Sequence, residues 1–227
     1  LTASEGAKEV FDPLAVMVVE NEEAQPVITP VHGWDDSLFL RGKAPMTKQE
    51  VRALAISKLR PEADHIVYDI GAGTGSCSVE LAFQVPYGKV YGFEINEEAA
   101  SLAEANKERF NACNLEIIRG NALEKIVNMP CPDRVFIGGT KGNLKEILDI
   151  LYKKNAYCRI VITAITLETA GAVTAYYKEH TDYELETTQL FASEGRRIGP
   201  YTLMEGHNPV YVMTAYRKEA EYEGQSK

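Results

Sequence analysis

The sequence predicts an α/β fold in which a parallel sheet ends in an antiparallel hairpin. From residue 65 onward, short runs rich in Ile and Val alternate with helical segments, which is the pattern of a parallel sheet with helices on both faces. A loop with alternating glycines follows the first of these runs. No helical segment separates the last two strand-like runs, so we expect those two strands to pair antiparallel.

The first 33 residues lack this regular pattern. Residues 14–19 are apolar and predict one strand, and an acidic run and the spaced prolines Pro26 and Pro30 then predict a linker. We interpret residues 1–33 as the tail of an upstream domain followed by a linker, with a native arm of the same domain as the alternative. Residues 34–218 are the expected main domain, and residues 219–227 form an acidic C-terminal tail.

The main domain begins with a helix predicted to run to residue 59, before Pro61. Thr47 is the expected N-cap, with Glu50 three residues later as in a capping box. Asn96 and Asn143 are the expected N-caps of two later helices. The predicted strands cover residues 65–70, 89–94, 115–119, 133–137, 157–164, 183–191 and 209–216. The predicted helices between them cover residues 74–84, 97–110, 123–127, 143–153 and 167–180.

Composition limits the classes of protein to which the chain can belong. With 227 residues, of which 45% are hydrophobic, it can bury one substantial core. No apolar run approaches the roughly 18 residues that a membrane span requires. The two ends, residues 1–33 and 219–227, carry −7 of the net charge of −9, and an acidic protein is a poor candidate for broad nucleic-acid binding.

Four cysteines are dispersed along the chain, without C-x-x-C pairs or histidines at metal-ligand spacing. We therefore expect no metal site, and we expect reduced thiols in the core of a cytoplasmic protein. The four are Cys77, Cys113, Cys131 and Cys158.

The glycine loop lies in Val67–Gly75, which reads V-Y-D-I-G-A-G-T-G. A dinucleotide fingerprint, G-x-G-x-x-G, would place its third glycine at position 76, which is Ser. Gly71, Gly73 and Gly75, with Asp69 just before them, instead resemble the first motif of methyltransferases that use S-adenosylmethionine (SAM). Together with seven strands that close in a hairpin, this loop predicts the Rossmann-like fold of class I SAM-dependent methyltransferases.

The ends of successive strands supply the candidate cofactor residues. Asp69 is placed to orient the ammonium group of SAM through water, and Glu94 to accept hydrogen bonds from the ribose hydroxyls. Asn121 and Ala122 follow the third strand, where adenine is usually bound. Each residue also has a purely structural alternative: Asp69 as a helix-cap partner, Glu94 as a solvated strand end and Asn121 as a turn former.

Four further stretches narrow the family. They are R-G-K-A-P-M-T-K-Q-E-V-R at 41–52, V-F-I-G-G-T-K-G at 135–142, T-A-I-T-L-E-T at 163–169 and N-P-V at 208–210. In this order around the glycine loop, they closely resemble the decarboxylating precorrin methyltransferases of cobalamin biosynthesis. Those enzymes methylate C15 of a tetrapyrrole and decarboxylate its C12 acetate. The resemblance covers residues 34–217.

The resemblance carries further expectations. It implies a precorrin substrate, SAM as cofactor and a homotetramer. Residues 11–33 are similar to the junction after the C5-methylating domain of fused enzymes, which implies a possible covalent fusion to such a domain. The family often has Asp where this chain has Glu94. The residues that the resemblance places in contact with SAM are Thr47, Gly71, Ala72, Gly73, Thr74, Gly75, Glu94 and Ala122.

A substrate with many carboxylates requires cations. Arg196 and Arg197, in the loop between the last two strands, are the candidate carboxylate clamp, with solvated loop charges as the alternative. Lys43, Lys48 and Lys141 lie in the family motifs. Gly138 and Gly139 suit the close approach of a flat ligand, although the same loop also fits a flexible turn.

The candidate catalytic residues are Thr140, as a hydrogen-bond donor, and Glu168, which follows the fifth strand and would orient substrate or carry a proton. Glu168 fits equally well as an acidic residue in the first turn of a helix. His207 is the other titratable candidate, and a lone loop histidine is more often structural.

Three other functions compete with this interpretation. A methyltransferase of the same fold that acts on RNA or protein would need a basic groove, and it leaves F-I-G-G-T-K-G unexplained. An NAD-dependent oxidoreductase is opposed by Ser76 and by the terminal hairpin. A non-catalytic cofactor-binding domain of a fused protein would tolerate the loss of the substrate loops, which are intact here.

Overall fold

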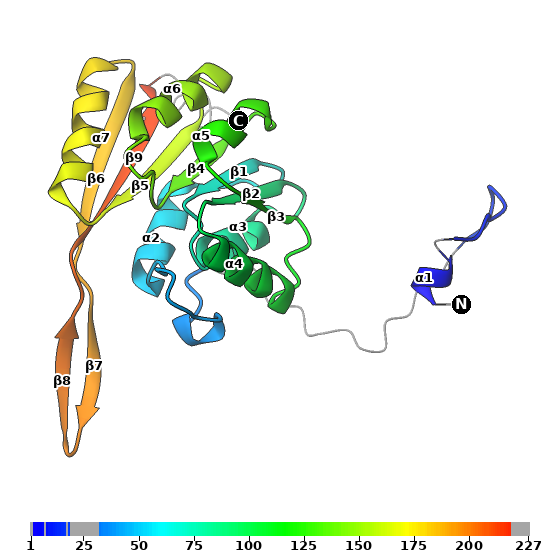
Figure 1. Ribbon diagram of the computed structural model, residues 1–227, viewed down its shortest axis with the longest axis horizontal. Helices are drawn as coiled ribbons and strands as arrows, with labels where there is room; N and C mark the ends of the chain where they lie inside the picture. The colour runs from blue at the N-terminus through cyan, green and yellow to red at the C-terminus, as the bar shows by residue number, and fades with distance from the viewer. Residues whose placement is uncertain (1, 7, 17, 19–31, 219–227) are drawn as a thin grey trace, which may run out of the picture.

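The computed structural model describes residues 2–6, 8–16, 18 and 32–218, and it shows a three-layer α/β/α domain (Figure 1). A seven-stranded sheet with the order β3-β2-β1-β4-β5-β9-β6 forms the middle layer. Its strands are β1 (Ile66–Ile70), β2 (Lys89–Glu94), β3 (Leu115–Arg119), β4 (Arg134–Ile137), β5 (Arg159–Ala164), β6 (Tyr183–Leu190) and β9 (Val210–Arg217). The first five strands pair parallel, and β9 pairs antiparallel with β6, as the sequence predicted, and also with β5.

Helices cover both faces of the sheet. The helices are α1 (Ala3–Gly6), α2 (Gln49–Leu59), α3 (Ser76–Gln84), α4 (Glu97–Arg109), α5 (Ala122–Lys125), α6 (Leu144–Lys154) and α7 (Leu167–Glu179), with short 3-10 helices η1 (Asp36–Leu38) and η2 (Ile126–Asn128). In Figure 1, α2, α3 and α4 lie on one face of the sheet, α5, α6 and α7 lie on the other, and α1 lies apart from both. Among the described residues, no helix has the length and apolar character needed to cross a bilayer.

The strands separate the core into two clusters because successive side chains of a strand point to opposite faces. Val67, Phe136 and Val161 pack in the cluster beneath α2 and α3. Their neighbours Tyr68 and Val135 pack in the cluster beneath α6 and α7. Since both faces are covered, these strands are apolar throughout rather than alternating, and their carboxyl ends are left as the edge where a ligand can bind.

The region between β6 and β9 differs from the prediction. The expected loop contains a second hairpin, β7 (Ser193–Ile198) and β8 (Tyr201–Gly206), which forms a separate two-stranded sheet. Every residue of both strands is exposed. Figure 1 shows this hairpin as an arm that extends away from the domain. The arm buries neither face within the described chain, so its sequence carries no burial pattern.

Three smaller predictions were wrong. The described part of residues 14–19, namely 14–16 and 18, forms no strand, and the side chains of Leu14 and Val16 are about nine-tenths exposed. Thr47 is not the N-cap of α2, the first helix of the main domain. This helix begins at Gln49 with Lys48 as N-cap, and the carbonyl of Thr47 accepts a hydrogen bond from Arg52. The cysteines are free, as expected, but Cys113 and Cys131 are exposed rather than in the core.

The caps of α4 and α6 allow a matched test of local stability. Asn96 Oδ1 accepts a hydrogen bond of 2.9 Å from the amide of Ala99, whereas Asn143 has the same N-cap position on α6 without a side-chain cap bond. We expect Asn96→Ala to lower the free energy of unfolding by about 1 kcal/mol, and Asn143→Ala to have a smaller effect. Urea denaturation of both variants measures the difference, and equal losses would show that the bond of Asn96 contributes nothing.

Candidate active site

A pocket of about 800 Å³ opens at the carboxyl ends of the parallel strands. Residues that end β1, β2, β4 and β5 form its floor, and residues 43–48, which precede α2, form part of its wall. The loop 120–122 after β3, the loop 138–143 after β4 and residues at the start of α7 also contribute to the lining. The volume is in the range that small-molecule ligands and cofactors occupy.

The glycine loop is held tightly against the protein itself. Gly71, Gly73 and Gly75 all have positive φ values, of 81°, 57° and 76°. A Cβ atom on Gly71 would lie 2.8 Å from the backbone nitrogen and oxygen of Gly139, and one on Gly73 would lie 2.6 Å from the carbonyl oxygen of Pro45. These glycines are therefore required for close contact between three loops, besides any approach to a ligand.

Glu94 ends β2 at the wall of the pocket and is 9% exposed. Its Oε2 accepts a 2.9 Å hydrogen bond from the amide of Gly73, and its Oε1 accepts a 2.8 Å hydrogen bond from the amide of Asn96. Two backbone donors thus fix the carboxylate while each oxygen retains a lone pair for a further donor. A fixed acceptor pair of this kind suits a ligand diol.

Asp69 lies beneath the glycine loop rather than in the pocket lining. Its Oδ2 accepts a 2.5 Å hydrogen bond from the Ser78 hydroxyl, whereas its buried Oδ1 has no hydrogen-bond partner among the described residues. Burial raises the pKa of Asp69 from 3.8 to about 7; the Ser78 hydrogen bond opposes this shift, and the nearby carboxylate of Glu94 adds to it. A buried, unpaired acceptor next to the loop fits a cofactor whose amino-acid end carries an ammonium group.

The raised pKa of Asp69 predicts a pH dependence of stability. Its pKa is higher in the folded protein than in the unfolded chain, so the stability it contributes is present below pH 4 and is lost as the pH rises to about 7. The slope is at most about 1.4 kcal/mol per pH unit. Asp69→Asn cannot ionise. We therefore expect the difference in free energy of unfolding between this variant and the wild type to favour the variant by about 2 to 3 kcal/mol more at pH 8 than at pH 5. Urea unfolding without ligand at both pH values tests this, and a constant difference between the two proteins would contradict it.

The loop after β3 contributes Asn121 and Ala122, which both line the pocket. Asn121 Oδ1 also caps α5 by accepting a 3.1 Å hydrogen bond from the amide of Leu123. The cap uses the side-chain oxygen, so the amide group of Asn121 keeps its two N–H donors for a ligand.

The opposite side of the pocket is formed by the loop after β4. Gly138, Gly139, Thr140 and Lys141 all line the pocket, and Lys141 has a positive φ of 49°. A side chain on Gly139 would meet no atom within 4 Å, so its surface is open. Among the described residues, no cluster of three or more His, Cys, Asp or Glu side chains is placed to hold a metal ion.

Several predicted site residues lie outside the pocket lining. Thr74 is buried within the glycine loop, and Gly75 ends the loop as the N-cap of α3. Glu168 is exposed in the first turn of α7, although its neighbours Thr166 and Thr169 do line the pocket. Arg196 and Arg197 are on the arm, where Arg196 pairs with Glu205 at 3.6 Å.

The prediction from sequence missed part of the lining. Pro45 and Met46 contribute through the segment before α2, and Thr166 and Thr169 contribute at the start of α7. Thr166 is also the N-cap of α7 and accepts a hydrogen bond of 3.2 Å from the amide of Thr169. Thr166 and Thr169 lie in the stretch 163–169, directly after β5. Their position after a parallel strand was the signal that could have placed them in the pocket.

Comparison with known proteins agrees with this geometry. Residues 38–217 match the family model described as a precorrin methyltransferase domain. A probable cobalt-precorrin-6B C(15)-methyltransferase (decarboxylating) of Pyrobaculum calidifontis is 40% identical over 195 residues, which cover 84% of this chain and 98% of that protein. The crystal structure of precorrin-6y C5,15-methyltransferase from Geobacter metallireducens has a TM-score of 0.78 at 37% identity and covers 84% of this chain and 98% of that one.

The fold extends to more distant proteins. A SAM-dependent O-methyltransferase of Thermotoga maritima has a TM-score of 0.63 at 16% identity, with coverage of 76% of this chain and 66% of that one. This likeness shows that the sheet order and the terminal antiparallel strands are those of the Rossmann-like class I methyltransferases. With the family match over most of its length, the chain belongs to the precorrin methyltransferases.

Proposed function

We propose that this protein is a SAM-dependent C-methyltransferase that methylates C15 of a precorrin and decarboxylates its C12 acetate, in cobalamin biosynthesis. The observation that carries the proposal is a single pocket with the D-x-G-x-G-x-G loop and Glu94 on one side and the G-G-T-K-G loop on the other. The first side suits SAM and the second suits a flat, acidic substrate.

When bound, SAM supplies a methyl group on a positively charged sulfur. Glu94 would accept hydrogen bonds from the ribose, and Asn121 and Ala122 would contact the adenine. Gly71, Ala72, Gly73 and Thr47 line the same part of the pocket. Asp69 would act from beneath the loop by its charge, and Thr74 and Gly75 would set the conformation of the loop.

The substrate side depends on alignment. Gly138 and Gly139 allow a flat macrocycle to lie against backbone, and Lys141 would bind one of its carboxylates, together with Lys43 and Lys48, which also line the pocket. Holding the substrate carbon in line with the methyl group contributes about 7 to 11 kcal/mol to catalysis in well-oriented reactions. We assign the hydroxyl of Thr140 as a donor to the substrate, and Glu168 as the group that orients substrate or carries a proton at the pocket edge.

The arm that carries Arg196 and Arg197 leaves the sheet next to Val210, which lines the pocket, and both arginines are exposed. We propose on this basis that they clamp substrate carboxylates. The arm exposes Ile198, Tyr201 and Leu203, each more than half exposed, which supports self-association. We propose a homotetramer on this basis. We also propose a cytoplasmic location, a methyltransferase domain spanning residues 34–218, and an upstream C5-methyltransferase domain joined through residues 1–33.

Calorimetry with SAM and with NAD tests the cofactor assignment. We expect one SAM to bind per chain and NAD to leave no heat of binding, because position 76 is a buried serine rather than the third glycine of a dinucleotide loop. Binding of NAD without binding of SAM would contradict the proposal.

A further inference from the structure

Residues 33–48 form a strap beside the pocket that has little regular structure of its own. It contains only the three-residue 3-10 helix η1, yet its residues 43–48 line the pocket. Its Pro45 carbonyl lies directly against Gly73 of the glycine loop. Side-chain contacts from the rest of the domain must therefore hold the strap in place.

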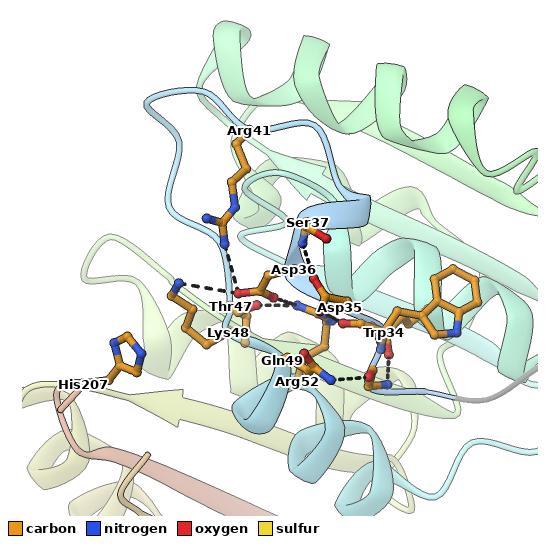
Figure 2. Close-up of polar contacts among 12 residues, drawn as sticks. Trp34, Asp35, Asp36, Ser37, Arg41, Thr47, Lys48, Gln49, Arg52 and His207 are labelled. Atoms are coloured by element: carbon orange, nitrogen blue, oxygen red, sulfur yellow. Dashed lines mark hydrogen bonds and ion pairs between the residues drawn. The ribbon is translucent and has the colours of Figure 1, made fainter. Parts of the chain in front are cut away.

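Arg52, in the first turns of α2, provides most of these contacts (Figure 2). Its side chain is fully buried, and its guanidinium donates four hydrogen bonds. Nη1 donates to the Thr47 carbonyl at 2.6 Å and to Asp36 Oδ1 at 3.0 Å, and Nη2 donates to the Trp34 carbonyl at 2.5 Å. Three of the four acceptors thus belong to the strap, two near its start and one near its end.

The fourth acceptor connects the strap to the glycine loop. Arg52 Nε donates to Glu80 Oε1 at 2.5 Å, and Glu80 lies fully buried on α3, the helix that follows the loop. The same carboxylate accepts hydrogen bonds from the amides of Gly33 at 2.5 Å and Trp34 at 3.0 Å. The Arg52–Glu80 pair therefore fixes the strap to the element that carries the cofactor loop.

Asp36 extends this cluster to the surface. Its carboxylate, 16% exposed, contacts the ammonium of Lys48 at 3.5 Å and the guanidinium of Arg41 at 3.0 Å as well as Arg52. A second anchor lies at Leu40, whose amide and carbonyl both bond to the buried side chain of Asn106. Residues 41–46 connect Leu40 to Thr47, whose carbonyl accepts a hydrogen bond from Arg52.

We propose that Arg52 is a positioning residue that sets the affinity for cofactor by holding residues 43–48 of the strap against the glycine loop, with Asp36 as its partner. Arg52 does not line the pocket itself, so it acts through Thr47 and the strap. Without the hydrogen bonds of the Arg52 guanidinium, a smaller fraction of molecules has residues 43–48 held against the glycine loop. The apparent dissociation constant for the cofactor rises as that fraction falls. The inference rests on the proposed binding of SAM in this pocket.

Arg52→Lys in the full chain is the sharpest test. Lysine keeps a positive charge beside Glu80, whereas methionine would leave a buried carboxylate unpaired and threaten folding. An ammonium group has no planar fork, so it cannot serve acceptors on opposite sides. We expect the dissociation constant for SAM, measured by calorimetry, to rise about tenfold. Amide hydrogen exchange is expected to speed up in residues 41–47 but not in β1 or β4.

The matched control is Arg134→Lys, at an arginine whose side chain is 17% exposed. Arg134 donates to the carbonyl of Arg60 at the amino end of β4, away from the pocket. SAM affinity and strap exchange are expected to be unchanged in this variant. If the wild type fails to bind SAM, the proposed function fails; if it binds and Arg52→Lys matches it in both affinity and strap exchange, the inference on Arg52 is overturned.

If Arg52→Lys speeds amide hydrogen exchange throughout the domain, it has destabilised the whole fold, and Asp36→Asn then serves as the test. This variant leaves the buried Arg52–Glu80 pair intact and removes the partly exposed charge of Asp36, which pairs with Arg41, Lys48 and Arg52. We expect weaker SAM binding, by about threefold or more, with faster exchange confined to the strap. Wild-type affinity and exchange in Asp36→Asn would overturn the inference.

Discussion

Gly71→Ala is expected to abolish measurable SAM binding. The backbone there has a φ of 81°, and the new Cβ would lie 2.8 Å from the backbone of Gly139, so the cofactor loop and the substrate loop would have to separate. The left-handed conformation and the forced shift together would lower the free energy of unfolding by about 2 kcal/mol or more. We expect SAM affinity to fall by more than about 100-fold, measured by calorimetry on protein shown to be folded.

Gly171→Ala is the matched control. Gly171 lies within α7, and a Cβ atom there would meet no atom within 4 Å. Alanine in a helix interior is favoured over glycine by about 1 kcal/mol, so this variant is expected to be at least as stable as the wild type and to bind SAM equally. Wild-type SAM affinity in Gly71→Ala would show that the contact with Gly139 is not needed.

The second large effect is expected at Glu94. Glu94→Ala removes the acceptor for the amides of Gly73 and Asn96 and leaves no carboxylate for the ribose. We expect SAM affinity to fall by about 100-fold, because hydrogen bonds to a charged group each contribute about 1.5 to 3 kcal/mol. Glu94→Gln, which keeps the size of the side chain and one acceptor oxygen, is expected to lose about tenfold.

Glu116→Ala separates this effect from a general loss of charge. Glu116 is on the neighbouring strand β3, where it pairs with Lys89 at 3.1 Å on the surface. It is expected to bind SAM as the wild type does, since exposed ion pairs contribute little. Equal affinities of Glu94→Ala and Glu116→Ala would refute the ribose-binding role of Glu94.

The sheet and its ligand-binding edge could be predicted because both follow from local patterns. The Ile- and Val-rich strands are buried on both faces, so their positions were evident, and β2 and β3 match the prediction residue for residue. Residues at the carboxyl ends of strands, such as Glu94 at the end of β2 and Asn121 shortly after β3, then had to meet at one edge. The glycine loop was equally predictable, because glycine adopts the positive φ values found at positions 71, 73 and 75 without steric cost.

The arm could not be predicted in the same way. β7 and β8 are exposed on both faces, so no burial pattern marks them as strands, and Arg196 and Arg197 were placed beside the substrate by their position in the sequence alone. The Gly199–Pro200 turn between them was the only local signal. Arg52 was hidden for a different reason, since its acceptors in the strap and its partner Glu80 on α3 meet only in the fold.

The mass of the product tests the central claim most directly. The protein is incubated with a precorrin that carries an unmethylated C15 and an intact C12 acetate, in the presence of SAM with a labelled methyl group. We predict a product that has gained the labelled methyl group and lost one carbon dioxide, formed only when SAM is present. Binding of SAM without transfer of the label or loss of carbon dioxide would contradict the assignment of this protein as a decarboxylating precorrin methyltransferase.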